Sequence, residues 1–151
     1  MPQHEELKYP NRLYMITMNN NHEVNPAKAL AMIQKGALLI DVREPNEVSK
    51  KSFDVSNIML IPLRELNKRF NEIPVDRTVI IACYSGNRSL MATRFLMSHG
   101  YTQALNMQQG IVRWEKEGHP IKNGLKQKSG SLLKQFFGKS EGNGGAILAQ
   151  L

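Results

Sequence analysis

The sequence predicts a single α/β domain in which helices cover both faces of a mainly parallel β-sheet. Several short runs are apolar without alternation, as in strands buried on both faces, and the β-branched run 78–82 is the clearest of them. Segments with helical spacing of apolar residues alternate with these runs, which implies right-handed crossovers between parallel strands. The chain of 151 residues is also long enough to bury one substantial core.

The first elements follow from short local signals. A brief strand is expected at 23–24 and a helix at 27–35. Asn25 is a good N-cap, Pro26 suits the first helical position, and Gly36 suits the C-cap.

The remaining elements follow from apolar runs and helical intervals. Strands are expected at 37–42, 58–61, 78–82 and 104–107. Helices are expected at 45–51, 63–73, 90–99 and 110–117. Trp114, in the last of these helices, is expected to anchor the core.

Two extensions flank the predicted domain, which spans residues 23–121. Residues 1–22 contain turn-forming and polar segments and predict an irregular extension. Residues 122–151 form a basic tail rich in Gly and Lys, with five lysines and one glutamate. A short amphipathic helix between Gly130 and Gly138 would present one Leu-Leu pair, Leu132 and Leu133, and one Phe-Phe pair, Phe136 and Phe137. Such a helix would suit weak contact with a protein or a membrane surface. A solvated basic tail is the simpler interpretation.

Composition narrows the class of protein. The formal net charge is +7, yet no Lys/Arg run and no interleaved aromatics appear, so a nucleic-acid partner is not expected. No apolar stretch reaches the length of a transmembrane helix, and the first residues do not resemble a secretory signal. The single cysteine excludes an internal disulfide and fits a reducing compartment, so we expect a cytoplasmic protein. The four histidines show no metal-ligand spacing, so no metal site is expected.

The lone cysteine, Cys83, stands between a predicted buried strand and a predicted helix. Open α/β sheets place their chemistry at the carboxyl ends of parallel strands. The positive end of the following helix, together with Arg88, should favour the thiolate. The alternative is that Cys83 only packs in the core, which is the commoner role of a lone cysteine. Its position favours a reactive sulfur.

The loop after Cys83 can stabilise an anion without a side-chain base. Backbone N–H groups that converge at a helix amino terminus bind negative charge. Gly86 would allow the close backbone approach that this requires. The predicted cradle consists of Tyr84, Ser85, Gly86, Asn87 and Arg88.

An ordered set of segments resembles the rhodanese family of sulfurtransferases. The matching pieces are Leu39–Pro45 (Leu-Ile-Asp-Val-Arg-Glu-Pro), Ile61–Leu63 (Ile-Pro-Leu), the Cys83–Ser89 loop, Gln109–Trp114 (Gln-Gly-Ile-Val-Arg-Trp) and Glu117–Ile121. Two pieces depart from the family pattern. Residues 51–57 replace a Gly-His-Ile segment followed by Gly-Ala, and Gln109 replaces the first of two glycines.

This resemblance implies a two-step exchange of sulfane sulfur. Cys83 would take sulfur from a small anionic donor, thiosulfate or a persulfide, and hold it as a persulfide. A small thiol, a thiol protein or cyanide would then accept it, and no cofactor is implied. Arg43 would lie near the site, where it binds an anionic donor or forms an ion pair that orients the loop. Asp41 is expected to orient or cap rather than to act as a base.

Two other functions compete with sulfur transfer. Cysteine phosphatases and arsenate reductases use a similar loop, but it holds one residue more than the four between Cys83 and Arg88. Ala82 also stands where such phosphatases usually carry histidine. The shorter loop favours one sulfur atom over a tetrahedral oxyanion. A non-catalytic interaction module of the same fold is the other alternative, in which the tail would carry the function.

Overall fold

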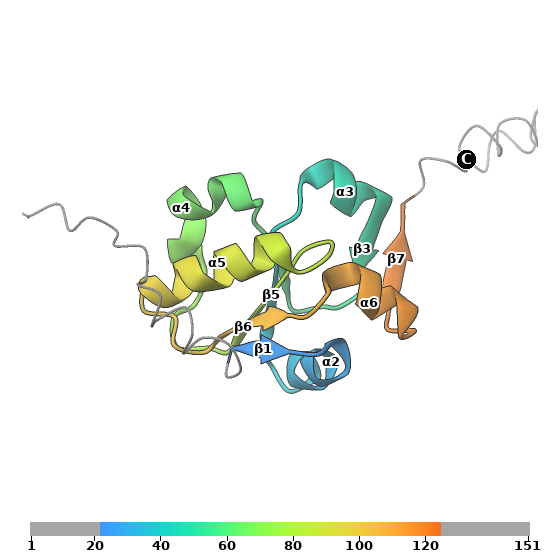
Figure 1. The fold of residues 1–151 in the computed structure, drawn as a ribbon, viewed down its shortest axis with the longest axis horizontal. Coiled ribbons are helices and arrows are strands. Elements are labelled where there is room, and N and C mark those ends of the chain that lie inside the picture. The colour runs from blue at the N-terminus through green and yellow to red at the C-terminus, as the bar shows by residue number, and fades with distance from the viewer. Residues whose placement is uncertain (1–21, 125–151) are drawn as a thin grey trace, which may run out of the picture.

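The computed structural model describes residues 22–124. Its centre is a five-stranded, fully parallel sheet in the order β1-β6-β5-β2-β4. Figure 1 labels β1, β6 and β5 of this sheet. The predicted α/β class with a mainly parallel sheet is therefore confirmed. Of the expected extension at 1–22, all but His22 lies outside the described residues, as does the possible helix between Gly130 and Gly138.

The elements alternate along the chain as predicted, with small shifts in their bounds. The sheet strands are β1 (Glu23–Val24), β2 (Leu38–Asp41), β4 (Ile58–Leu60), β5 (Val79–Ala82) and β6 (Ala104–Met107). The α-helices are α2 (Pro26–Gln34), α3 (Pro45–Lys50), α4 (Leu66–Arg69), α5 (Asn87–Ser98) and α6 (Gly110–Lys116). None of the helices within residues 22–124 has the length and hydropathy that a membrane span needs.

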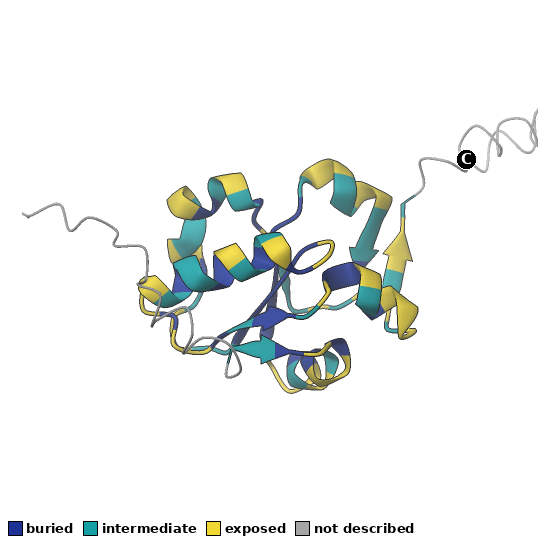
Figure 2. Ribbon diagram, viewed as in Figure 1, coloured by how far each residue is buried: buried dark blue, intermediate teal, exposed yellow. Residues whose placement is uncertain are grey.

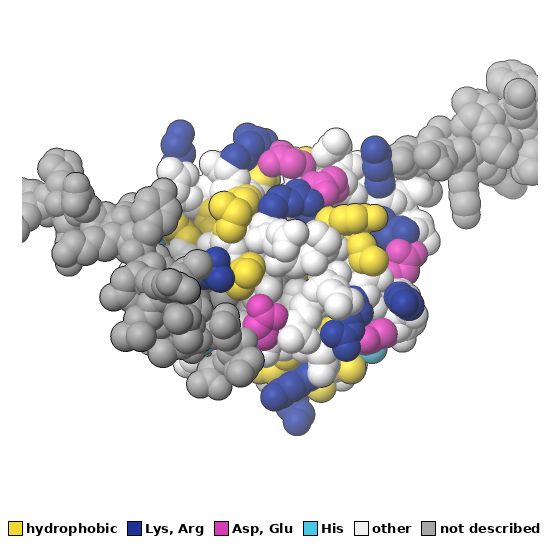
Figure 3. Space-filling model, in the orientation of Figure 1, with side chains coloured by type: hydrophobic (Ala, Val, Ile, Leu, Met, Phe, Trp, Pro, Cys, Tyr) yellow, Lys and Arg dark blue, Asp and Glu magenta, His cyan; other side chains and the backbone are white. Residues whose placement is uncertain are grey.

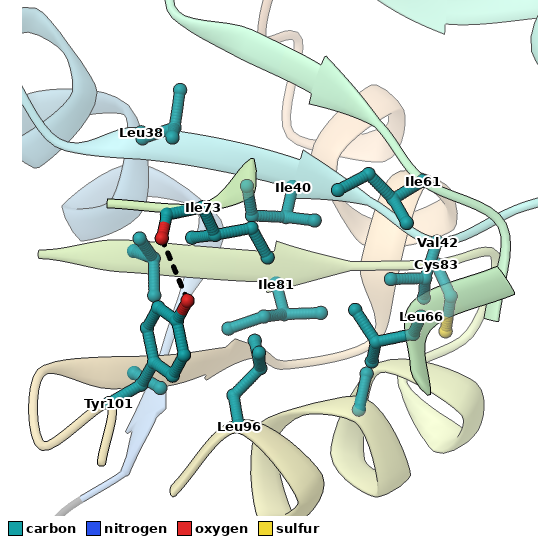
Figure 4. Packing of buried hydrophobic residues seen from close by; sticks show 13 residues of the cluster. Leu38, Ile40, Val42, Ile61, Leu66, Ile73, Ile81, Cys83, Leu96 and Tyr101 are labelled. Carbon is teal, nitrogen blue, oxygen red and sulfur yellow. Dashed lines mark hydrogen bonds between the residues drawn. The ribbon is translucent and has the colours of Figure 1, made fainter. Parts of the chain in front are cut away.

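Alternating side chains of the central strands pack into two separate cores, one on each face of the sheet. Ile40 and Ile81 join the core under α4 and α5, whereas Leu39 and Ile80 join the core on the face of α2 and α6. All four of these side chains are fully buried, and Figure 4 shows the first core from close by. Figure 2 shows the same division, with buried strands between helices that are exposed on their outer sides. Burial on both faces explains why these strands are apolar without alternation.

Two short strands outside the main sheet were not predicted. β3 (Lys51–Phe53) pairs antiparallel with β7 (Ile121–Asn123). The predicted helix at 45–51 therefore ends one residue early, and ordered structure continues to Asn123. Phe53 packs edge-on against Trp114, with ring centroids 5.3 Å apart, and the indole N–H donates to the Pro120 carbonyl at 2.8 Å. Trp114 is fully buried, so its predicted role as a core anchor is confirmed.

The predicted continuous helix at 63–73 is wrong. The segment is instead a 3₁₀ turn η1 (Leu63–Glu65), the short α4 and a second 3₁₀ turn η2 (Phe70–Glu72). The backbone departs from ideal helical geometry at Glu65 (φ −103°, ψ −6°) and at Arg69 (φ −119°, ψ 0°), which divides the segment into three short turns. The Tyr101 hydroxyl donates to the carbonyl oxygens of Phe70 and Ile73, at 2.6 and 2.7 Å. Figure 4 shows the second of these bonds. A side chain from a distant segment thus helps to satisfy the carbonyls at the end of the last turn, where helical segments leave backbone acceptors unpaired.

Candidate active site

Cys83 follows β5 directly and lies at the carboxyl edge of the sheet. The β2–β5 pairing continues to the edge of the site, because the Val42 amide donates to the Ala82 carbonyl at 3.0 Å. The Cys83 residue is only 1% exposed, and its sulfur sits at the end of the apolar cluster drawn in Figure 4. After it the chain turns sharply and α5 begins at Asn87, three residues earlier than predicted.

Two polar groups contact the sulfur. The Gly86 amide donates to Sγ at 3.1 Å, and the hydroxyl of Ser89 lies 3.3 Å from it. Both donors can stabilise a thiolate, and hydrogen bonds to a charged acceptor are the stronger kind. Ser89 is fully buried and was not among the predicted site residues. Its place in the first turn of the helix that follows the cysteine is the signal that could have found it.

Only one amide of the predicted cradle donates a hydrogen bond to the Cys83 sulfur in this structure. Among the five amides from Tyr84 to Arg88, that of Gly86 alone donates to Sγ. Tyr84 and Ser85 form the exposed tip of the loop, visible between β5 and α5 in Figure 2. The amides of Asn87 and Arg88 stand in the first turn of α5, where no carbonyl within the helix can accept from them. Whether these amides hold the outer sulfur of a persulfide stays a prediction about the loaded site.

The start of α6 holds the loop in place through backbone hydrogen bonds. The amides of Ile111 and Val112 donate to the carbonyls of Cys83 and Tyr84, at 3.0 and 3.2 Å. This contact requires glycine at position 110, because a Cβ there would lie 2.3 Å from the Cys83 carbonyl oxygen. Gln109, which replaces a family glycine, adopts a left-handed conformation with φ 60°.

Arg43 and Asp41 form a buried ion pair. The Arg43 Nη2 atom donates to Asp41 Oδ2 at 2.7 Å, and the Arg43 side chain is 2% exposed. Its Nη1 atom donates to the Lys51 carbonyl at 3.0 Å, which connects the end of β2 to β3. The guanidinium carbon also lies 5.4 Å from the centre of the Phe53 ring. Of the two roles left open for Arg43, these contacts favour the structural one.

Arg88 forms a second ion pair across the loop. Its two terminal nitrogens donate to the two oxygens of Glu47, each at 2.7 Å. These hydrogen bonds lower the pKa of the Glu47 carboxyl from 4.5 to about 2. The same bonds raise the pKa of Arg88 above its usual value, and the nearby charges of Cys83 and Asp41 add to that shift. Glu47 was not predicted, because it is 41 residues away in the sequence.

Known proteins match this chain over the same region. The family model described as Rhodanese-like domain matches residues 25–117. A sulfurtransferase of Allochromatium vinosum is 39% identical over 84 residues, which cover 56% of this chain and 77% of that protein. The thiosulfate sulfurtransferase GlpE of Haemophilus influenzae is 29% identical over 103 residues, which cover 66% of this chain and 92% of that protein. Two Bacillus subtilis relatives are matched over only 40% and 60% of their length.

A solved structure agrees with the sequence matches. The crystal structure of a rhodanese-related protein from Thermoplasma volcanium superposes with a TM-score of 0.61 and 31% identity. That comparison covers 67% of this chain and 97% of the other. The parallel sheet, the loop that follows its central strand and the match over residues 25–117 lead to one conclusion. This chain belongs to the rhodanese-like domain family.

Proposed function

We propose that this chain is a sulfurtransferase in which the Cys83 sulfur carries the transferred atom. One observation supports the proposal most strongly. The only thiol of the chain stands at the carboxyl edge of a parallel sheet, with the Gly86 amide and the Ser89 hydroxyl both directed at Sγ. Relatives named sulfurtransferase give the chemistry that such a thiolate would perform.

The proposed reaction needs no external reductant or oxidant. In the first step the Cys83 thiolate attacks the outer sulfur of thiosulfate, the S–S bond to the sulfonate breaks, and sulfite leaves with the electron pair. With an organic persulfide as donor, the leaving group is the corresponding thiolate. In the second step an acceptor thiolate or cyanide attacks the outer sulfur of the Cys83 persulfide. The acceptor leaves as a persulfide or thiocyanate, and the Cys83 thiolate is restored.

The burial of Cys83 adds a conformational requirement to this reaction. At 1% exposure, the sulfur is covered in the unloaded site. A donor therefore reaches Sγ when the exposed side chains of Tyr84 and Ser85 swing outward. The backbone of the loop stays in place, because α6 donates to the carbonyls of Cys83 and Tyr84 and the Gly86 amide donates to the sulfur. Such a movement lies within the ordinary repertoire of active-site loops.

The geometry supports sulfur transfer better than phosphate chemistry. A cysteine phosphatase uses the arginine of its loop to clamp phosphoryl oxygens, as bidentate guanidinium groups do. Here the guanidinium of Arg88 is already bound through two hydrogen bonds to Glu47. A phosphate group would have to displace a carboxylate that stays ionised at neutral pH.

Turnover assays with a Cys83→Ser variant test the proposal. Wild-type protein should transfer sulfur from thiosulfate or a persulfide to cyanide, measured as thiocyanate, and the variant should be inactive. Ser98→Ala is a matched control, since Ser98 is exposed at the far end of α5 and should keep wild-type rates. Equal rates in wild type and Cys83→Ser would refute the mechanism.

A further inference from the structure

The charges nearest the candidate site form a neutral group of four. Asp41 and Arg43 are paired at the end of β2, and Glu47 and Arg88 are paired between α3 and α5. The two pairs also influence each other, since Arg43 contributes to the lowered pKa of Glu47 and Asp41 to the raised pKa of Arg88. In Figure 3, basic and acidic side chains lie side by side between α3 and the amino end of α5.

Neutralisation of Arg88 limits what this site offers to an anion. A guanidinium in a bidentate pair presents a dipole rather than a free charge, so its attraction for a dianion falls steeply with distance. The Arg88 side chain is 35% exposed, so it can be reached, but both of its terminal nitrogens already donate to Glu47. Arg43 is buried in its own pair and is closed to solvent.

The rim of the loop is apolar on the side of α6. Tyr84 is 56% exposed and Val112 is 42% exposed. Their backbones are in contact, because the Val112 amide donates to the Tyr84 carbonyl at 3.2 Å. A donor that carries carbon next to its sulfur can pack against these side chains, whereas the sulfonate of thiosulfate gains nothing from them.

We propose that Glu47 is a specificity-determining residue, which by neutralising Arg88 makes the site favour a singly charged organic persulfide over a dianionic donor. This inference rests on the proposed sulfurtransferase function. The favoured step is attack of the Cys83 thiolate on the outer sulfur of R–S–S⁻. The S–S bond of the donor breaks, R–S⁻ leaves with the electron pair, and Cys83 becomes the persulfide. No proton is transferred, and the charge is the same on both sides.

The Glu47→Gln variant isolates the charge with little change in shape. Glutamine keeps an oxygen that can accept from the Glu44 amide, as Glu47 does at 2.9 Å, while the negative charge is lost. Arg88 then has a net charge that a donor can feel. Across about 6 Å of water-like medium, one positive charge should raise the loading rate about tenfold for a dianion and about threefold for a monoanion.

The experiment measures the single-turnover loading of Cys83 by intact mass, with thiosulfate and with N-acetylcysteamine persulfide as the two donors. We expect Glu47→Gln to gain about tenfold with thiosulfate and about threefold with the persulfide, and both gains to shrink at high salt. The double variant Glu47→Gln/Arg88→Met should return both rates to within about twofold of wild type. Arg88→Met alone leaves the carboxylate unpaired and should slow both donors, thiosulfate the more.

Controls separate failure of this inference from failure of the proposed function. Glu72, in η2, forms an ion pair with Arg69 of α4. Glu72→Gln removes this carboxylate and should leave the loading rates with both donors unchanged. If both donors load Cys83, and the ratio of their two loading rates is the same in wild type, Glu47→Gln and Arg88→Met, then Glu47 does not determine specificity. That result would leave the proposed function standing. Glu47→Gln should speed loading by thiosulfate and Arg88→Met should slow it, so either variant tests the inference if the other folds poorly. Absence of loading by either donor in every protein would overturn the proposed function, and this inference with it.

Discussion

The contact between α6 and the loop that follows Cys83 predicts that Gly110→Ala is severely destabilising. A Cβ at this position would lie 2.3 Å from the Cys83 carbonyl oxygen and 2.6 Å from that of Tyr84. Both neighbours are backbone atoms, so no side-chain rotation can relieve the overlap. The start of α6 must move away from the loop that carries the candidate nucleophile.

The size of the effect follows from two terms. The left-handed conformation of Gly110, with φ 52°, costs an alanine roughly 1–2 kcal/mol. Displacement of α6 breaks the hydrogen bonds to the carbonyls of Cys83 and Tyr84, which contribute about 1 kcal/mol each. We therefore expect a loss of about 3–4 kcal/mol in the free energy of unfolding.

Gly100→Ala provides the matched control for this prediction. Gly100 also has a positive φ, 92°, but no atom lies within 4 Å of the Cβ position. Its substitution should cost only the backbone term, about 1–2 kcal/mol, in urea or thermal unfolding. Sulfur transfer should fall about tenfold or more in Gly110→Ala and stay at the wild-type rate in Gly100→Ala. Equal destabilisation of the two variants, with transfer intact in both, would refute the proposed bracing of the loop.

Three further predictions follow from the polar groups around the loop. Since the folded-state pKa of Glu47 is lowered to about 2 from 4.5, its pair with Arg88 stabilises the fold above pH 4.5. That contribution, about 1–2 kcal/mol after allowance for solvent screening, should be lost as pH falls from about 4.5 to 2, so unfolding titrations of wild type and Glu47→Gln should converge there. Asp41→Asn leaves the buried guanidinium of Arg43 without its counter-charge and should cost about 3–5 kcal/mol in thermal unfolding; a loss below about 1 kcal/mol would contradict the pair's role. Ser89→Ala removes one of the two donors to Sγ and should slow sulfur transfer about tenfold at constant stability, so an unchanged rate would exclude the hydroxyl from the reaction.

Local patterns were enough to predict the central sheet and the position of the cysteine. The runs that contain Ile40 and Ile81 are buried on both faces, so their composition is apolar at every position. The cap at Asn25 depends on neighbouring residues only, and its side chain does accept from the Lys28 amide at 2.8 Å. Such features are determined by a few neighbouring residues, so they can be predicted from the sequence.

Features that depend on distant segments could not be predicted in the same way. β3 is three residues long and forms because β7, far along the chain, pairs with it. The pairing of Arg88 with Glu47 depends on how α3 and α5 are placed, and neither residue's neighbours indicate it. The burial of Cys83 likewise depends on distant segments, because its side chain belongs to the apolar cluster that contains Ile61 and Leu66.

The most direct test of the central claim is the intact mass of the protein after treatment with a sulfur donor. We predict that the wild-type chain gains one sulfur atom, that cyanide removes it, and that Cys83→Ser gains none. A wild-type mass that stays unchanged with both thiosulfate and an organic persulfide would refute Cys83 as the sulfur carrier. The same gain in Cys83→Ser would contradict it equally, because the sulfur would then be held elsewhere.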